Sequence, residues 1–164
     1  FFAHRRVGQN GVPFRCYKFR TMHVGADHIL AKHLAGCPTA RVEYERDQKL
    51  KNDPRVIPGV GHFLRKSSLD ELPQFLNVLL GQMSVVGPRP VTEDELLRYG
   101  NAAPMVLSVR PGITGKWQVS GRNDVTYEQR VAMDYEYVKS WSFLDDLNII
   151  ARTVKVVLGG QGAY

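Results

Sequence analysis

Two adjacent carboxylates, Asp70 and Glu71, follow a pair of cations in the stretch from residue 65 to residue 73. Acids beside cations suit a reaction in which a carboxylate meets a phosphate, either as a nucleophile or as a metal ligand. A structural interpretation also fits, because Ser68 and Glu71 have the S-x-x-E spacing of a capping box. Amides at a helix N-terminus bind phosphate oxygens, so the two interpretations are compatible and both stay open.

Single cations in stiff or extended segments are the next candidates for binding phosphate. In the loop 87–90, of sequence GPRP, two prolines restrict the backbone around Arg89. This restriction lowers the entropy that the arginine loses when it binds an anion. A proline-stiffened surface turn is an equally good interpretation of this loop, and for the other cations an ordinary solvated surface position is the plainer one. The other cations are Lys18 and Arg20 at a strand end, and Arg110 and Arg122 beside glycine-rich loops.

The composition is that of one globular domain with anionic partners. The chain has 164 residues, of which 43% are hydrophobic, and a net charge of +6. This length supports one substantial core. The positive charge favours nucleic acid, phosphorylated small molecules or an acidic membrane surface as partners. Cys16 and Cys37 form no C-x-x-C pair and are expected to be free thiols. No apolar run approaches the roughly 18 residues of a spanning helix.

The elements that must position these residues form an α+β pattern. Two strand-like segments, 2–7 and 12–19, flank Asn10-Gly11, a strong hairpin signal. We expect this N-terminal β-hairpin to precede a mainly helical domain with short strands and functional loops rich in proline and glycine. Most apolar residues of the C-terminal helices are expected in the core. The expected helices are 25–34, 41–50, 68–80, one starting at Thr92, 126–140 and 143–157, and a short strand is expected at 116–119.

The order of four motifs is more specific than any motif alone. They are YKFRTM at 17–22, LDELPQ at 69–74, VGPRP at 86–90 and RPGITG at 110–115. Together they resemble the bacterial sugar transferase family, the monotopic polyprenyl-phosphate phosphoglycosyl transferases, over essentially the whole chain. Segment 117–125 and the last three residues are most similar to the undecaprenyl-phosphate galactose phosphotransferase branch.

This resemblance implies transfer of a hexose 1-phosphate from a UDP-sugar to undecaprenyl (polyprenyl) phosphate, with release of UMP. Such a reaction is the first membrane step of exopolysaccharide, capsule or O-antigen synthesis. The resemblance also implies Mg²⁺ as cofactor, Asp70 as the nucleophile that carries a covalent intermediate, and Glu71 as the metal ligand. Lys18, Arg65 and Arg89 would hold phosphate oxygens. The remaining candidates are Arg20, Arg110 and Arg122 for phosphate binding, and Pro90, Asn123 and Asp134 as further site residues.

The region before the hairpin is where the chain departs from the family pattern. Family members carry an apolar re-entrant helix there, which this sequence lacks. We therefore expect residues 1–164 to be the catalytic domain without its N-terminal membrane segment or segments. Its expected place is the cytoplasmic face of the bacterial inner membrane.

Two alternatives from other classes remain open at this stage. They are a basic nucleic-acid-binding module and a non-catalytic membrane scaffold. The acid pair at 70–71 argues against nucleic acid, because it would repel a phosphate backbone lying against the preceding cations. The sugar stays open between galactose, glucose and a modified hexose. The oligomeric state stays open between a monomer and a homodimer.

Overall fold

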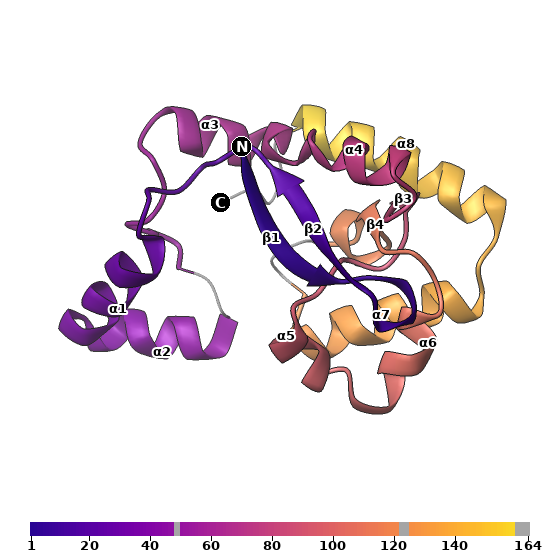
Figure 1. Cartoon of the computed structure of the whole chain (residues 1–164), viewed down its shortest axis with the longest axis horizontal. Coiled ribbons are helices and arrows are strands. Elements are labelled where there is room, and N and C mark those ends of the chain that lie inside the picture. Colours follow the sequence, from indigo (N-terminus) through magenta and orange to yellow (C-terminus); the bar gives the residue numbers. More distant parts are fainter. Residues whose placement is uncertain (48–49, 122–124, 160–164) are drawn as a thin grey trace.

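The structure, a computed structural model, consists of an N-terminal β-hairpin followed by a mainly helical remainder that contains a second, short pair of strands (Figure 1). This confirms the α+β architecture predicted from the sequence. The structure describes residues 1–47, 50–121 and 125–159. The strands are β1 (Phe2–Val7), β2 (Pro13–Lys18), β3 (Ser84–Val86) and β4 (Gly112–Thr114). The helices are α1 (Ala26–Gly36), α2 (Pro38–Asp47), α3 (Val60–Lys66), α4 (Gln74–Leu79), α5 (Glu93–Leu97), α6 (Ala103–Leu107), α7 (Tyr127–Lys139) and α8 (Phe143–Gly159).

Several sequence predictions need correction. The segment predicted as a strand at 116–119 is a 3₁₀ turn, Trp117–Val119. Trp117 and Val119 are both buried, so their alternation imitates a strand although the backbone is helical. The helix predicted from residue 68 begins only at Gln74, after a separate 3₁₀ turn, Leu69–Glu71. Helix α3 and strand β3 were not predicted, because elements of seven and three residues carry too little periodicity.

Helix α4 is fixed to the hairpin by one buried amide. The Asn77 side chain is fully buried, and its Nδ2 donates to the carbonyl of Arg15 at 2.7 Å and to Oε1 of Gln82 at 2.7 Å. Its Oδ1 accepts a hydrogen bond from the amide of Tyr17 at 3.1 Å. A fully paired buried amide holds its neighbours in one arrangement. Asn77 therefore sets the position of α4 relative to β2.

The parallel strands β3 and β4 bring the loop 87–90 against the RPGITG segment. The amide of Gly87 donates to the Thr114 carbonyl at 2.9 Å, and the amide of Gly112 donates to the Pro88 carbonyl at 2.8 Å. A Cβ on Gly112 would lie 2.2 Å from the nitrogen of Gly87. Only glycine permits this approach of two backbones. The glycines of both motifs thus have a structural purpose: they fix the loop that carries Arg89.

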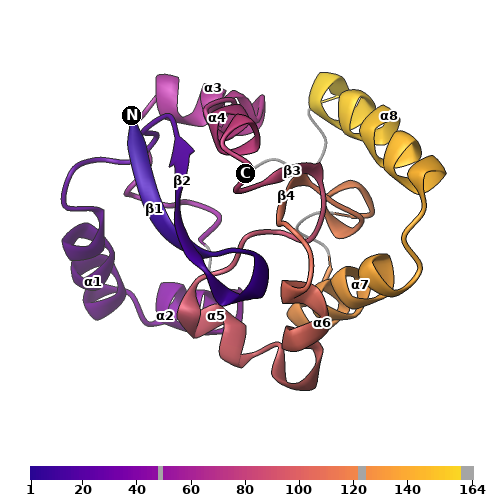
Figure 2. The ribbon, with the colours of Figure 1, turned by 45° about the vertical axis from the view of Figure 1, so that its right-hand side comes forward.

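The remaining core holds α7 and α8 against these strands. One cluster contains Val86, Val119, Tyr137 and Ile149. Figure 2 shows the hairpin and the short strands between α3 and α4 on one side and α5, α6 and α7 on the other. A second cluster contains Val91, Tyr99 and Val106, and a third contains Phe14, Cys16 and Met83.

Helices α3, α4 and α8 expose much of their apolar surface. Helix α4 buries the polar Gln74 and Asn77 while Leu79 is 83% exposed. The expectation that most apolar residues of the C-terminal helices pack in the core is wrong for α8, since Ile149 is its one buried side chain among those that the structure describes. Within the described ranges, no helix is both long and apolar enough to cross a bilayer. We call the following exposed side chains the apolar face: Val60, Phe63, Leu72, Phe75, Leu76, Leu79, Leu80, Phe143, Leu144, Leu147, Ile150 and Val154.

Candidate active site

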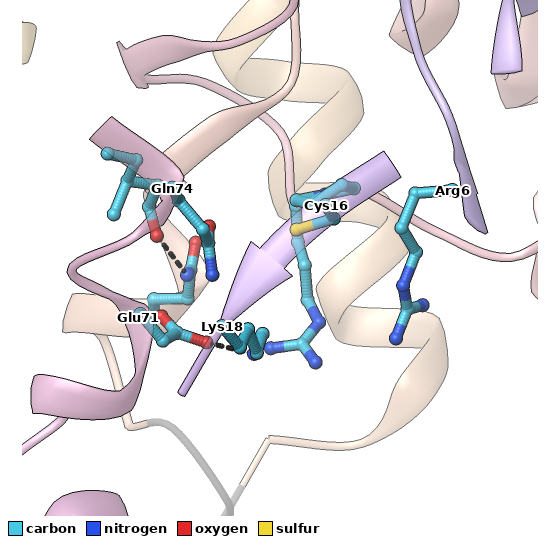
Figure 3. Close-up of a pocket in the computed structure, with 9 residues that line it drawn as sticks. Arg6, Cys16, Lys18, Glu71 and Gln74 are labelled. Carbon is cyan, nitrogen blue, oxygen red and sulfur yellow. Dashed lines mark hydrogen bonds and ion pairs between the residues drawn. The ribbon is translucent and has the colours of Figure 1, made fainter. Parts of the chain in front are cut away.

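A small pocket lies where the hairpin meets the turn 69–71, the loop 87–90 and strand β4. Charged side chains from distant parts of the sequence converge in this pocket (Figure 3). Fixed charges of opposite sign in a partly buried pocket interact more strongly than on an open surface. The lining residues are Arg6, Cys16, Lys18, Glu71, Gln74, Arg89, Pro90, Ile113 and Gln118.

Glu71 points into this pocket and pairs with Lys18. The Nζ of Lys18 donates to Oε1 of Glu71 at 2.5 Å, and both side chains are about one quarter exposed, at 25% and 24%. Burial alone would raise the pKa of Glu71. The charges of Lys18 and Arg89 and hydrogen bonds from Lys18 and Gln74 outweigh burial and lower that pKa. Glu71 is therefore an ionised acceptor at neutral pH.

The capping box predicted from Ser68 and Glu71 is absent. Ser68 has a left-handed backbone, with φ of 57°, and its side chain makes no capping hydrogen bond. Its amide donates to the carbonyl of Arg65 and its own carbonyl accepts from the amide of Glu71, so Ser68 joins the end of α3 to the 3₁₀ turn through its backbone alone. The attraction of two cations for Glu71 in the pocket exceeds the modest gain from an exposed cap. Glu71 accordingly turns toward Lys18.

Asp70 lies beside the pocket on the same 3₁₀ turn. Its backbone carbonyl accepts a hydrogen bond from the amide of Phe19 at 2.8 Å, which ties the turn to the end of β2. The pKa of the Asp70 carboxyl is raised, chiefly by burial and also by the charge of Glu71. The charges of Lys18 and Arg65 oppose this shift. The side chain is half-buried. Its carboxyl thus has a pKa raised mainly by burial and makes no ion pair in the described part of the chain.

Arg89 and Pro90 reach the pocket from the loop after β3. The flanking Pro88 and Pro90 are buried, while Arg89 is half-buried. The Arg89 guanidinium lies 5.8 Å from the centre of the Trp117 ring, a weak cation–π contact that leaves its N–H groups available. This arrangement agrees with the prediction of a stiff loop that presents one cation.

Asp134 is a buried neighbour of this region rather than a pocket wall. It is 1% exposed, and its Oδ2 accepts a hydrogen bond from the Tyr99 hydroxyl at 3.0 Å. Its Oδ1 has no partner in the described part of the chain. Burial raises the pKa of Asp134 to about 7, although the Tyr99 hydrogen bond and the Arg89 charge oppose this shift. Its contacts make it a positioning candidate near Arg89.

The other predicted site residues are not brought into the pocket. Arg20 is exposed and stacks on the Phe2 ring, with its guanidinium carbon 5.3 Å from the ring centre. Arg110 is also exposed, and its carbonyl lies against Gly87. Arg65 acts on Asp70 through its charge without lining the pocket. Arg122 and Asn123 lie outside the described residues.

Five lining residues were not among the predicted site residues: Arg6, Cys16, Gln74, Ile113 and Gln118. Gln74 and Ile113 stand inside the LDELPQ and RPGITG motifs, and Cys16 and Gln118 carry no recognisable signal. Arg6 does, because residues on one face of a strand alternate and cross-strand partners share a face. The hairpin register pairs Arg6 with Phe14, which lies two and four residues from Cys16 and Lys18. The register set by the Asn-Gly turn therefore places Arg6 on the same face of the hairpin as Lys18.

A carboxylate pair among fixed cations is suited to phosphorylated substrates, which need their negative charge balanced. Comparison with known proteins identifies the family of the chain. It belongs to the bacterial sugar transferase family, whose model matches residues 1–160.

Named relatives share the sequence over nearly all of the chain. The undecaprenyl-phosphate galactose phosphotransferase of Salmonella typhimurium is 55% identical over 163 residues, or 99% of this chain and 34% of the relative. The exopolysaccharide production protein ExoY of Sinorhizobium fredii is 52% identical over 164 residues, or 100% of this chain and 72% of the relative. The UDP-glucose:undecaprenyl-phosphate glucose-1-phosphate transferase of Escherichia coli is 39% identical over 171 residues, covering 99% of this chain and 33% of the relative. The chain thus spans about a third of the first and third of these relatives.

Proposed function

We propose that this chain carries the catalytic site of a phosphoglycosyl transferase, which moves a hexose 1-phosphate from a UDP-sugar to a polyprenyl phosphate and releases UMP. One observation carries the proposal: the turn 69–71 holds two acids where Lys18 and Arg89 converge. The names of the Salmonella and E. coli relatives, a galactose phosphotransferase and a glucose-1-phosphate transferase acting on undecaprenyl phosphate, support this reaction. Family membership also favours a transferase over a nucleic-acid-binding module.

The reaction proceeds in two displacements. In the first, a carboxylate oxygen of Asp70 forms a bond to the β-phosphorus of the UDP-sugar. The bond from that phosphorus to the bridging oxygen breaks, and UMP leaves with the electron pair. In the second, an oxygen of the polyprenyl phosphate attacks the same phosphorus, and the bond to Asp70 breaks. An acyl phosphate is a reactive mixed anhydride, so it transfers its group to a weak nucleophile. The carboxylate is restored at the end.

The cations of the pocket make the first attack feasible. A carboxylate and a diphosphate repel each other, so fixed positive charge must offset this repulsion before the bond forms. Lys18 pairs with Glu71, and Arg89 lines the same pocket. The charges of Lys18 and Arg89 lower the pKa of Glu71. Lys18 and Arg65 also favour the ionised form of Asp70 against the effect of burial. These residues therefore orient the diphosphate and favour the charged form of the nucleophile.

We propose that Mg²⁺ binds at this site through Glu71 and substrate oxygens. The donor set fits such an ion, because Mg²⁺ is usually held by one or two carboxylates together with phosphate oxygens. In the described part of the chain, no group of three or more acidic, histidine or cysteine side chains is placed to hold a metal. An ion at Glu71 would thus need the phosphates of the substrate as ligands. When bound, the ion neutralises phosphate charge.

We propose that the apolar face rests on the cytoplasmic leaflet of the inner membrane, where the polyprenyl acceptor is found. Figures 1 and 2 place α3, α4 and α8 along the same edge of the molecule. The exposed fractions of Leu76, Leu79 and Leu144 are 52%, 83% and 75%. Large exposed apolar patches mark membrane or protein contacts. The pocket adjoins this edge through the turn that precedes α4.

Turnover with a panel of UDP-sugars tests the proposed function. The full-length protein, Mg²⁺ and undecaprenyl phosphate are incubated with UDP-galactose, UDP-glucose and UDP-N-acetyl sugars, and UMP release is measured. We expect sustained UMP release, beyond the single equivalent that the first displacement frees, to depend on the acceptor, with UDP-galactose the preferred donor because of the Salmonella relative. Release of UDP in place of UMP would indicate an ordinary glycosyl transferase and contradict the proposal. Turnover without the lipid acceptor would contradict the acceptor assignment.

A further inference from the structure

Arg6 is a cation of the pocket to which the reaction above assigns no role. It comes from β1, on the face of the hairpin that also carries Cys16 and Lys18. Its side chain is 17% exposed, and its Nη1 donates to Oε2 of Glu95 at 2.7 Å. Figure 3 shows Arg6 across the pocket from the pair formed by Glu71 and Lys18. A partly buried arginine that lines a pocket with two other cations is available for an anionic ligand.

The charges that line the pocket are unbalanced. Three lining residues are cations, Arg6, Lys18 and Arg89, whereas the lining acid is Glu71. Glu95 lies behind Arg6, and its Oε2 also accepts a hydrogen bond from the amide of Thr92, so it belongs to the capping box of α5. After burial, the neighbouring Arg89 charge is the largest influence that lowers the pKa of Arg6. Two arginines held near each other in a pocket favour the binding of an anion.

The hydrogen-bonding capacity of Arg6 is only partly used. A guanidinium has five N–H donors, and the bond to Glu95 occupies one at Nη1. Within the described residues, the Arg6 side chain makes no other hydrogen bond. Glu95 therefore orients the guanidinium and leaves donors for a second acceptor. An arginine that is oriented by a carboxylate loses less entropy when it binds a phosphate.

We propose that Arg6 binds the α-phosphate of the UDP-sugar, the phosphate that leaves with the nucleoside. The proposal rests on the proposed function. The acids stand at one side of the pocket, so the phosphate attacked by Asp70 lies there beside Lys18. A diphosphate that extends from this point across the pocket brings its other phosphate to Arg6. Negative charge grows on this phosphate as UMP departs, and a fixed guanidinium stabilises it.

Direct binding of UMP to the full-length protein tests this inference without requiring turnover. Isothermal titration calorimetry is performed with UMP and with uridine, which lacks the phosphate, on the wild type, Arg6→Gln and Glu95→Gln. Gln at residue 95 can preserve the capping box, so Glu95→Gln removes the ion pair with Arg6 and keeps the helix cap. We expect Arg6→Gln to weaken UMP binding by roughly tenfold or more and to leave uridine binding unchanged. The amide oxygen of the glutamine introduced at residue 95 can still accept a hydrogen bond from Arg6 and keep it oriented, so Glu95→Gln is expected to leave UMP binding within about twofold of the wild type.

A purely structural Arg6 gives a different pattern. Both variants would then weaken UMP and uridine binding to similar extents, which would overturn the inference. If Arg6→Gln does not fold, Arg6→Lys replaces it, because it keeps the charge and loses the planar fork. UMP binding by Arg6→Lys equal to that of the wild type would also overturn the inference. Failure of the proposed function gives a separate result. In that case the wild type binds UMP in a way that depends on Arg6, but it releases no UMP from any UDP-sugar.

Discussion

The Nζ of Lys18 lies 2.5 Å from Oε1 of Glu71, and this pair joins the end of β2 to a turn 53 residues later in the chain. The contact explains why Glu71 does not cap a helix. It also explains how the two neighbouring acids differ, since the pKa of Glu71 is lowered and that of Asp70 is raised. Acids with different environments suit different roles. Glu71 is the charged ligand, and Asp70 is free of a strong side-chain partner in the described structure.

Substitution of Glu71 by Gln tests the ligand role. Gln keeps the size of the side chain and removes the charge that Lys18 and a metal ion would share. We expect the Mg²⁺ concentration for half-maximal activity to rise by about tenfold or more. Glu93→Gln is the matched control, since Glu93 is exposed and pairs only with Arg5 in the described structure. An unchanged metal titration of Glu71→Gln would remove Glu71 from the metal site.

Substitution of Gly112 by Ala tests the backbone contact that positions Arg89. The added Cβ would lie 2.2 Å from the nitrogen of Gly87 and 2.5 Å from the carbonyl oxygen of Thr114. Neither atom can move without separating β3 from β4, so we expect the free energy of unfolding to fall by about 3 kcal/mol or more. Gly36→Ala is the control, because its Cβ would meet nothing within 4 Å. Urea unfolding measures both, and equal stabilities would refute the contact.

Substitution of Asn77 by Asp tests the buried amide between α4 and β2. The new carboxylate oxygens would face the carbonyl of Arg15 and Oε1 of Gln82, where Nδ2 now donates. Unpaired buried acceptors are costly, and we expect a loss of roughly 3 kcal/mol in the free energy of unfolding at pH 7. Asn148→Asp, on the exposed surface of α8, serves as the control. A difference below about 1 kcal/mol between the variants would mean that the amide does not hold α4.

The buried Asp134 predicts a pH-dependent stability. Its pKa is raised from 3.8 to about 7 by burial, so the folded state binds a proton that the unfolded state releases above about pH 4. Stability from this group is complete below pH 4 and is lost as the pH rises through 7. The full change is on the order of 4 kcal/mol. We expect Asp134→Asn to flatten the fall in free energy of unfolding between pH 4 and pH 7. The same slope in both proteins would contradict the assignment.

The sequence was sufficient for the hairpin and for the convergence of its motifs. The Asn-Gly turn set the register, and the structure brings Lys18, Glu71, Arg89 and Pro90 to one pocket. The roles given to Arg20 and Arg110 rested on their place in motifs, and the structure shows both side chains exposed. The RPGITG motif instead allows the backbone contact with loop 87–90.

Other features depended on tertiary contacts that local patterns do not contain. The S-x-x-E spacing was present, but the choice of Glu71 between the Ser68 amide and Lys18 required knowledge of the hairpin position. Helical periodicity likewise located the leucines of α4 without showing which face is covered. The buried face is the one with Asn77, because that side chain completes the edge of β2. Periodicity thus located the apolar side of α4 but did not show whether that side is buried or exposed.

Asp70→Asn in the full-length protein is the most direct test of the central claim. Asn has the shape of a protonated Asp70 and cannot form the acyl phosphate. With UDP-galactose labelled in the β-phosphate, we expect the wild type to retain label after acid denaturation and to pass it to undecaprenyl phosphate. The variant is expected to lose both, with turnover reduced by roughly 1,000-fold or more, while the exposed control Asp94→Asn keeps both. Normal transfer of label by Asp70→Asn would contradict the account.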